Sequence, residues 1–178
     1  AAAIHLGLKK KQSLSALVST CSAAVTLVLT LVIISKGSDL AGSFTWASIP
    51  GFDGIEVGYE LNRLSRGMML VVTGVGFLVH VFSLAYMKDD SALARYFCGL
   101  SLFMFSMTGI VLATNFIMMF MFWELVGLSS YLLIGHWYQK DSAADASKKA
   151  FLTNRIGDFG FMIGILILWG ITGSFTFN

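Results

Sequence analysis

The sequence predicts an all-α fold, a polytopic bundle of about five transmembrane helices. Of its 178 residues, 56% are hydrophobic and only 12% are charged, whereas soluble domains carry about 25% charged residues. Five apolar segments each approach the length that crosses a bilayer as a helix, which is about 17–25 residues. The net charge of +2 is too small to indicate a nucleic-acid-binding protein. We therefore expect an integral membrane protein with no nucleic-acid partner.

The predicted spans follow one another in a single transmembrane domain that takes up residues 1–178. They cover residues 13–34, 67–87, 97–114, 116–138 and 151–172. The first span is longer than the apolar core of a signal peptide, which has about 7–15 residues, so it is predicted as a membrane helix. A single residue, Asn115, separates the third span from the fourth, which predicts a very tight turn.

Residues 35–66 form the one long polar segment and are predicted to lie outside the membrane. They contain the only proline, Pro50, together with several glycines and four acids. This composition predicts little helix. Aromatic residues such as Trp46 and Tyr59 suit the membrane interface.

The basic residues are divided unevenly between the two sets of connections, which predicts the orientation. One set holds Lys9, Lys10, Lys11, Lys88, Arg95, Lys140, Lys148 and Lys149. The other holds Lys36, Arg63 and Arg66, diluted by Asp39, Asp53, Glu56 and Glu60. Because basic residues favour cytoplasmic loops, we expect the first set to face the cytoplasm, or its equivalent, the mitochondrial matrix or stroma.

Three ionisable side chains lie well inside predicted spans: His80, Glu124 and Asp158. A charge at the centre of a membrane helix costs about 2.5–3.5 kcal/mol on insertion scales, so such residues indicate a functional site. Glu124 lies about nine residues from the Asn115 turn, near the middle of its span. Gly127, Tyr131 and Gly135 share its helix face, and the two glycines would let a neighbouring helix approach. Glu124 is predicted either to exchange protons or to hydrogen-bond a neighbouring helix in its protonated form.

The segment DSAADASKKAFLTNRIGDFGFM, residues 141–162, contains a second polar group. Ser142 and Asp145 have the spacing of a capping box, which predicts a helix that starts outside the membrane. Lys148, Arg155 and Asp158 fall on one stripe of that helix, at steps of seven and three residues. Arg155 can pair with Asp158 as a local salt bridge, or both can belong to a polar path.

His80 and Asp158 are predicted to lie at the same depth. Each is about eight residues from the cytoplasmic end of its span, or about 12 Å at helical rise. They can therefore meet if their helices touch, and imidazole relays protons near neutral pH. The alternative is a structural histidine. His136, at the end of its span, is predicted as an interfacial residue without a special role.

No metal site is predicted, because Cys21 and Cys98 lie far apart and lack the spacing of metal ligands. An alternative of a different class is a haem-binding membrane anchor with His80 and His136 as axial ligands. These histidines differ in depth by about 9 Å at helical rise, which fits one haem poorly.

Three stretches carry a resemblance to a known family: HVFSLAYMKDDSALARYF, FWELVGLSSYLLIGHWY and KKAFLTNRIGDFGFMIGILIL. In this order, from about Tyr59 to the C-terminus, they resemble the large antiporter-like membrane subunit of complex I, the NADH:quinone oxidoreductase, which pumps protons at the distal end of the membrane arm. The closing WGITGSFTF is also similar to the related subunit of the photosynthetic, plastoquinone-reducing complex. Mrp-type cation/proton antiporter subunits share the Trp-Glu span.

The resemblance implies a larger antiporter-like fold built from inverted repeats. This chain is expected to be an N-terminal fragment of it, without the first helix and without the broken helix that carries the family's lysines. Glu124 matches the family's fifth-helix glutamate, and His80 matches its third-helix histidine. Arg155 and Asp158 match sixth-helix positions.

The resemblance further implies proton translocation along Glu124, Asp158 and His80, with Arg155 and Lys148 as charge partners. The chain itself is expected to hold no cofactor; NADH, FMN, iron–sulfur clusters and quinone are expected in partner subunits. The expected partners are other membrane subunits and the lipid bilayer, in a bacterial inner, mitochondrial inner or thylakoid membrane. Whether the coupled ion is a proton or sodium stays open.

Overall fold

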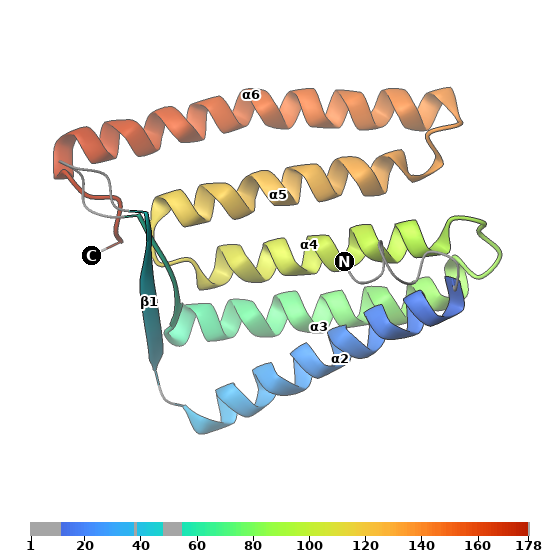
Figure 1. Cartoon of the computed structure of the whole chain (residues 1–178), viewed down its shortest axis with the longest axis horizontal. Helices are drawn as coiled ribbons and strands as arrows, with labels where there is room; N and C mark the ends of the chain where they lie inside the picture. The colour runs from blue at the N-terminus through green and yellow to red at the C-terminus, as the bar shows by residue number, and fades with distance from the viewer. Residues whose placement is uncertain (1–11, 38, 48–54, 178) are drawn as a thin grey trace.

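The computed structural model describes residues 12–37, 39–47 and 55–177, in which five long helices lie side by side with a β-hairpin across one end (Figure 1). The helices are α2 (Gln12–Lys36), α3 (Arg63–Tyr86), α4 (Leu93–Leu112), α5 (Phe116–Ile134) and α6 (Asp141–Thr172). The strands are β1 (Leu40–Ala47) and β2 (Ile55–Leu61), and one 3-10 turn, η1 (Gly135–Trp137), follows α5.

Each of the five helices is long and apolar enough to cross a membrane. The predicted class, an all-α transmembrane bundle, is thereby confirmed, and the chain is an integral membrane protein. Three helices begin at least four residues before the predicted spans: α3 starts at Arg63, α4 at Leu93 and α6 at Asp141. At 32 residues, α6 is about 48 Å long, against about 30 Å for the hydrocarbon core. Its polar first turns therefore extend beyond the membrane.

Asparagine side chains begin two of the helices. Asn62 caps α3, because its Oδ1 accepts from the backbone N–H of Ser65 at 2.9 Å while Ser65 Oγ accepts from the N–H of Asn62 at 2.7 Å. Asn115 caps α5 by accepting from the N–H of Met118 at 2.8 Å. Only three residues separate α4 from α5, which confirms the predicted tight turn.

The capping box predicted at the start of α6 is wrong. The helix begins one residue before Ser142, and its N-cap residue, Lys140, makes no side-chain capping hydrogen bond. Asp145 instead lies 3.4 Å from Lys148 Nζ on an exposed face. Asp141 occupies the first turn of α6. Its negative charge interacts favourably with the helix dipole there, which stabilises the start of the helix at this residue.

The polar segment between α2 and α3 contains an antiparallel hairpin that the sequence analysis did not predict. β1 pairs with β2 from Leu40 opposite Leu61 to Ala47 opposite Ile55. The expectation of little helix is confirmed for residues 39–47 and 55–61. Residues 38 and 48–54, which include Pro50, lie outside the described residues.

Three contacts tie this end of the bundle together. Asn115 Nδ2 donates to the carbonyl of Glu56 on β2 at 2.7 Å, and Arg66 on α3 pairs with Asp39 at 2.8 Å. After α6, the chain returns to the start of α5, where the N–H of Phe116 donates to the carbonyl of Phe175 at 2.9 Å. The outer ends of α5 and α6 are therefore joined through the backbone.

The helices pack through small and polar residues. On α2 the buried residues are Ser15, Ala16, Ser19, Ala23 and Thr30. Small side chains let membrane helices approach closely. Large apolar side chains such as Val25 and Leu29 point outward and are more than half exposed, so they are available to lipid or to further helices.

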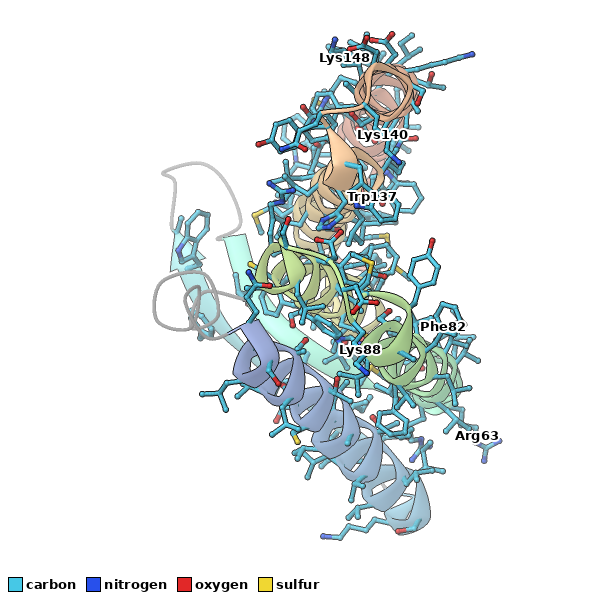
Figure 2. The ribbon with its side chains drawn as sticks, turned by 90° about the vertical axis from the view of Figure 1, so that its right-hand side faces the viewer. Arg63, Phe82, Lys88, Trp137, Lys140 and Lys148 are labelled. Carbon is cyan, nitrogen blue, oxygen red and sulfur yellow. The ribbon has the colours of Figure 1, made fainter. Side chains whose placement is uncertain are left out.

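The two ends of the bundle hold different basic residues, and the end with the α3–α4 and α5–α6 connections is called the basic end below. Figure 2 looks onto the end that holds the α3–α4 and α5–α6 connections, with Lys88, Lys140 and Lys148 spread along it. The opposite end holds the hairpin and the α4–α5 turn, with Lys36 and Arg63. The alternation of the five spans is as predicted; which end faces the cytoplasm stays a prediction. Lys9, Lys10, Lys11 and Asp53 lie outside the described residues.

Candidate functional site

Glu124, predicted as the central acid, forms an ion pair with Arg155 across the α5–α6 interface. Arg155 also lies 3.7 Å from Asp158, one turn along α6. Asp158 Oδ1 accepts from the indole Nε1 of Trp123 at 3.0 Å. These four residues are called the Glu124 cluster below.

The local geometry of the two helices brings the Glu124 cluster together. Trp123 and Glu124 are neighbours on α5, so one α5 segment presents both an indole N–H and a carboxylate toward α6. Arg155 and Asp158 lie three residues apart, on one face of α6. The guanidinium therefore bridges both carboxylates, so the predicted pairing with Asp158 is part of a larger arrangement.

The Glu124 cluster is shielded from solvent to different degrees. The side chains of Asp158, Glu124 and Arg155 are 10%, 24% and 39% exposed. With both carboxylates ionised, the single guanidinium leaves a net charge of −1. Excess charge is unfavourable where the dielectric constant is low. The Glu124 cluster therefore holds one more acidic than basic side chain.

A cleft of about 520 Å³ adjoins the Glu124 cluster between α4, α5 and α6. Trp123 and Asp158 line it, as does Gly127. A Cβ added to Gly127 would meet nothing within 4 Å, so the prediction that this glycine lets a neighbouring helix approach is wrong for the described residues. At Gly135 such a Cβ would lie 3.1 Å from Ser147 Oγ, so the predicted close approach of a neighbouring helix is confirmed at this glycine.

The predicted meeting of His80 with Asp158 is wrong. α4 and α5 lie between α3, which carries His80, and α6, which carries Asp158 (Figure 1). The depth estimate compared positions along the membrane normal only, and the lateral order of the helices separates the two residues. His80 is 1% exposed, and its Nδ1 lies 2.7 Å from the carbonyl oxygen of Gly76.

Lys148 shares the α6 stripe with Arg155 but is not part of the Glu124 cluster. It lies seven residues before Arg155, or about 10 Å at helical rise. Its side chain is 67% exposed and pairs with Asp145. Its role as a charge partner stays a prediction.

His136 has more partners than its predicted interfacial position implied. It is 4% exposed, and its Nε2 lies 3.3 Å from Asp90 Oδ1. Trp137 Nε1 donates to the other oxygen of Asp90 at 2.7 Å. Burial raises the pKa of Asp90. Hydrogen bonds from the N–H of Ala92, from Trp137 and from His136 lower it by more than burial raises it, so the pKa of Asp90 lies below its ordinary value.

These contacts fasten the α3–α4 connection to η1 at the basic end of the bundle. The acids of the sequence KDDS, residues 88–91, could have indicated these contacts. A carboxylate in a loop can accept hydrogen bonds from a nearby indole and imidazole. His80 and His136 have different surroundings, so the geometry gives no support to the haem-binding alternative. Within the described residues, no group of three or more His, Cys, Asp or Glu side chains has the arrangement of a metal site.

Comparison with known families and proteins matches most of the chain. The model of "NADH-Ubiquinone oxidoreductase (complex I), chain 5 N-terminus" matches residues 46–97, and that of "NADH:quinone oxidoreductase/Mrp antiporter, TM" matches residues 113–178. The chain is 46% identical over 145 residues to NAD(P)H-quinone oxidoreductase chain 5 of Synechocystis sp.. It is 52% identical over 124 residues to the chloroplastic subunit 5 of Marchantia polymorpha.

These alignments cover 82% and 70% of the chain but 21% and 18% of the relatives. The chain thus spans about a fifth of the length of the curated relatives it matches. Among solved structures, a chain of the Mrp complex from Dietzia sp. is similar with a TM-score of 0.79 and 25% identity, over 98% of this chain and 19% of that one. A chain of an archaeal membrane-bound sulfane sulfur reductase shares the fold, with a TM-score of 0.69, 21% identity and 98% and 35% coverage.

Proposed function

We propose that this chain, which belongs to the subunit 5 family of complex I-type NAD(P)H-quinone oxidoreductases, is part of a proton-translocating membrane subunit in which the Glu124 cluster carries the proton. The observation that supports this proposal is the arrangement of Arg155, a single guanidinium between Glu124 and Asp158. Such an arrangement has two states with the same contacting groups: in one the guanidinium lies closer to Glu124, and in the other it lies closer to Asp158.

The proposed step starts from the ion pair between Glu124 and Arg155. A proton that binds the Glu124 carboxylate removes its charge and weakens its attraction for the guanidinium. Arg155, which stays protonated at physiological pH, then moves toward Asp158. When the guanidinium returns, it favours the ionised form of Glu124 and expels the proton. No electron moves in this chain.

The energy for this cycle is proposed to come from redox chemistry in partner subunits. NADH, FMN, iron–sulfur clusters and quinone would be held there, and this chain would hold no cofactor. Other membrane subunits would contact its exposed apolar faces. The chloroplastic and cyanobacterial relatives favour a thylakoid-type membrane over a bacterial or mitochondrial inner membrane, and plastoquinone as the quinone.

The test replaces the charge at Glu124 without changing its shape, in the complete subunit within its complex. Glu124→Gln keeps the side-chain volume and can accept from Arg155, but it carries no charge at any pH. We expect it to assemble normally and to lose most proton uptake by vesicles, while Glu124→Asp retains part. Asp158→Asn is expected to lower uptake as well, because Arg155 then loses its second partner.

A purely structural role for Glu124 gives the reverse order, with Gln harmless and Asp harmful through its shorter reach. Wild-type proton uptake by the Gln variant, normalised to assembled complex, would therefore sink the proposal.

A second candidate function is a Mrp-type cation/proton antiporter subunit. The similarity to the Dietzia Mrp chain, at a TM-score of 0.79, favours it. Transport in sodium-free medium separates the two functions: uptake that continues without sodium supports the proton pump, and uptake that stops supports the antiporter.

A further inference from the structure

Trp123 is the one member of the Glu124 cluster that carries no charge. Its indole Nε1 donates to Asp158 Oδ1 at 3.0 Å, while Arg155 Nη1 lies 3.7 Å from the other oxygen, Oδ2. The indole and the guanidinium therefore approach different oxygens of the same carboxylate. The proton step proposed above assigns no role to this indole.

The orientation of the indole is fixed by packing against α6. The ring centroids of Trp123 and Phe161 lie 5.5 Å apart, with an edge-on arrangement at 64°, which aromatic pairs favour. Phe120, one turn earlier on α5, packs against the ring of Phe161 at 5.8 Å. Phe161 follows Asp158 by three residues, so both lie on one face of α6. The same segment of α6 therefore supplies the acceptor and the ring that orients the donor.

The hydrogen bond from Trp123 stabilises the charge of Asp158. This aspartate is buried, so a charge there depends on its protein contacts. A hydrogen bond to a charged acceptor is about twice as strong as one to a neutral acceptor. Arg155, at 3.7 Å, lies beyond the usual hydrogen-bond length of about 2.7–3.2 Å. The indole is therefore the closer of the two donors to Asp158.

The contact between Trp123 and Asp158 affects where the guanidinium of Arg155 lies. Within the described part of the chain, Trp123 and Arg155 are the two polar groups in contact with the carboxylate of Asp158. Arg155 makes its hydrogen-bonded ion pair with Glu124 instead. Without the indole, Arg155 would be the remaining group able to compensate the charge of Asp158. The guanidinium would then be drawn away from Glu124.

We propose that Trp123 is a positioning residue that keeps Arg155 on Glu124. Its indole N–H stabilises the ionised Asp158 and thereby leaves the guanidinium to the Glu124 ion pair. No bond breaks at the indole, and the proton stays on Nε1 throughout. An effect of Trp123 on proton uptake rests on the proposed function, whereas its effect on the place of Arg155 does not.

The effect on Arg155 is tested by ultraviolet resonance Raman spectroscopy of the indole N–H, in the complete subunit within its complex. In each background, subtracting the spectrum of the corresponding Trp123→Phe protein isolates this indole from all other tryptophans. In Asp158→Asn we expect a weaker hydrogen bond, because the acceptor is neutral. In Glu124→Gln we also expect a weaker one, because Arg155 moves toward Asp158 and shares its charge. An indole band that stays unchanged in either variant would overturn the inference.

The effect on proton uptake is tested by comparing Trp123→Phe with Trp123→His. Phenylalanine keeps a ring against Phe161 but has no N–H. The imidazole ring superposes on the five-membered ring of indole, so neutral histidine can place an N–H where Nε1 lies. A hydrogen bond to a charged group changes an equilibrium by about tenfold or more. We expect uptake per assembled complex to fall at least about threefold in Trp123→Phe, and Trp123→His to recover part of it.

A role of Trp123 in packing alone gives the reverse order, because phenylalanine fills more of the space than histidine. Trp123 is 48% exposed, so neither change leaves a closed cavity. Trp137→Phe is the matched control, since it also removes an indole donor from a carboxylate, that of Asp90 at 2.7 Å, but at the basic end. Its uptake per assembled complex is expected to equal that of the wild type. Uptake in Trp123→Phe that equals or exceeds that in Trp123→His would overturn the positioning role.

The outcomes separate this inference from the proposed function. Normal uptake in assembled Trp123→Phe, together with loss of uptake in Glu124→Gln, would overturn the role of Trp123 and leave the Glu124 proposal standing. Normal uptake in Glu124→Gln would refute the Glu124 proposal. The expected weakening of the indole hydrogen bond in Asp158→Asn and Glu124→Gln would then still support the placement of Arg155 by Trp123.

Discussion

Gly109 on α4 controls how closely α5, and with it Glu124, can pack. A Cβ placed on Gly109 would lie 2.2 Å from Cδ1 of Phe122 and 2.4 Å from its Cγ and Cε1. Carbon atoms attract one another only at about 3.5–4.0 Å, so the ring must retreat by roughly 1.5 Å. Phe105 packs edge-on against the same ring at a centroid distance of 5.5 Å, which restricts its escape. Gly109→Ala therefore forces α4 and α5 apart.

The size of the effect follows from two opposing contributions. Overpacking costs about 1–3 kcal/mol. The added methyl group would overlap the ring carbons of Phe122, which cannot bend away, so we expect a cost at the upper end of this range. Replacing glycine by alanine inside a helix gains about 1 kcal/mol. The expected net destabilisation is about 2 kcal/mol. Gly170→Ala on α6 is the matched control, since a Cβ there would meet nothing within 4 Å, and it is expected to be neutral or slightly stabilising.

The assay is thermal unfolding of the complete subunit in detergent, followed by circular dichroism, together with proton uptake in the assembled complex. Phe122 precedes Glu124 by two residues, so displacement of α5 is expected to lower uptake as well as stability. Phe122→Leu in the Gly109→Ala background removes the clash and is expected to restore part of both. A Gly109→Ala protein as stable as Gly170→Ala, or one that Phe122→Leu does not rescue, would refute this account of the α4–α5 packing.

Two further predictions concern the basic end. Asp90→Asn is expected to destabilise the subunit by about 1–2 kcal/mol near neutral pH, because hydrogen bonds to a charged group are lost. The folded pKa of Asp90 lies below its ordinary value of 3.8, so its contribution is complete above that value and is lost as pH falls through the folded pKa; melting curves of both proteins are expected to converge on acidification, and a difference that does not depend on pH would contradict the assignment. Lys140→Cys is expected to be labelled by an impermeant reagent from the cytoplasmic side, and labelling from the opposite side would reverse the orientation.

The membrane spans could be predicted because their signal is local. A run of about twenty apolar residues suffices to indicate a membrane helix, and a helix occupies most of each of the five predicted runs. The start of α6 outside the membrane was indicated by the spacing of Ser142 and Asp145, although the capping hydrogen bonds expected from that spacing do not form. The hairpin depends on pairing between segments separated in sequence, which composition does not indicate.

The candidate site was predictable in its residues and only partly in its contacts. Glu124, Arg155 and Asp158 were found because charges inside a membrane span are unfavourable. That Arg155 reaches across to Glu124 depends on the rotation of α5 against α6, and no spacing within one helix encodes it. The same limit explains the error at His80, whose depth was estimated without knowledge of which helices lie between. His136 was underestimated because its partner Asp90 comes from a distant loop.

The backbone link between Phe116 and Phe175 bears on how fast the Glu124 cluster can respond. α5 and α6 are connected at one end by the short segment that contains η1 and at the other end by this hydrogen bond, so the two helices form a frame, that is, a pair linked at both ends. Such a frame resists hinge opening, which takes microseconds to milliseconds. Exchange of Arg155 between its carboxylates is left to side-chain rotation, which takes picoseconds to nanoseconds where side chains are free to turn. We therefore expect any exchange of Arg155 between the two carboxylates to proceed without opening of the α5–α6 pair.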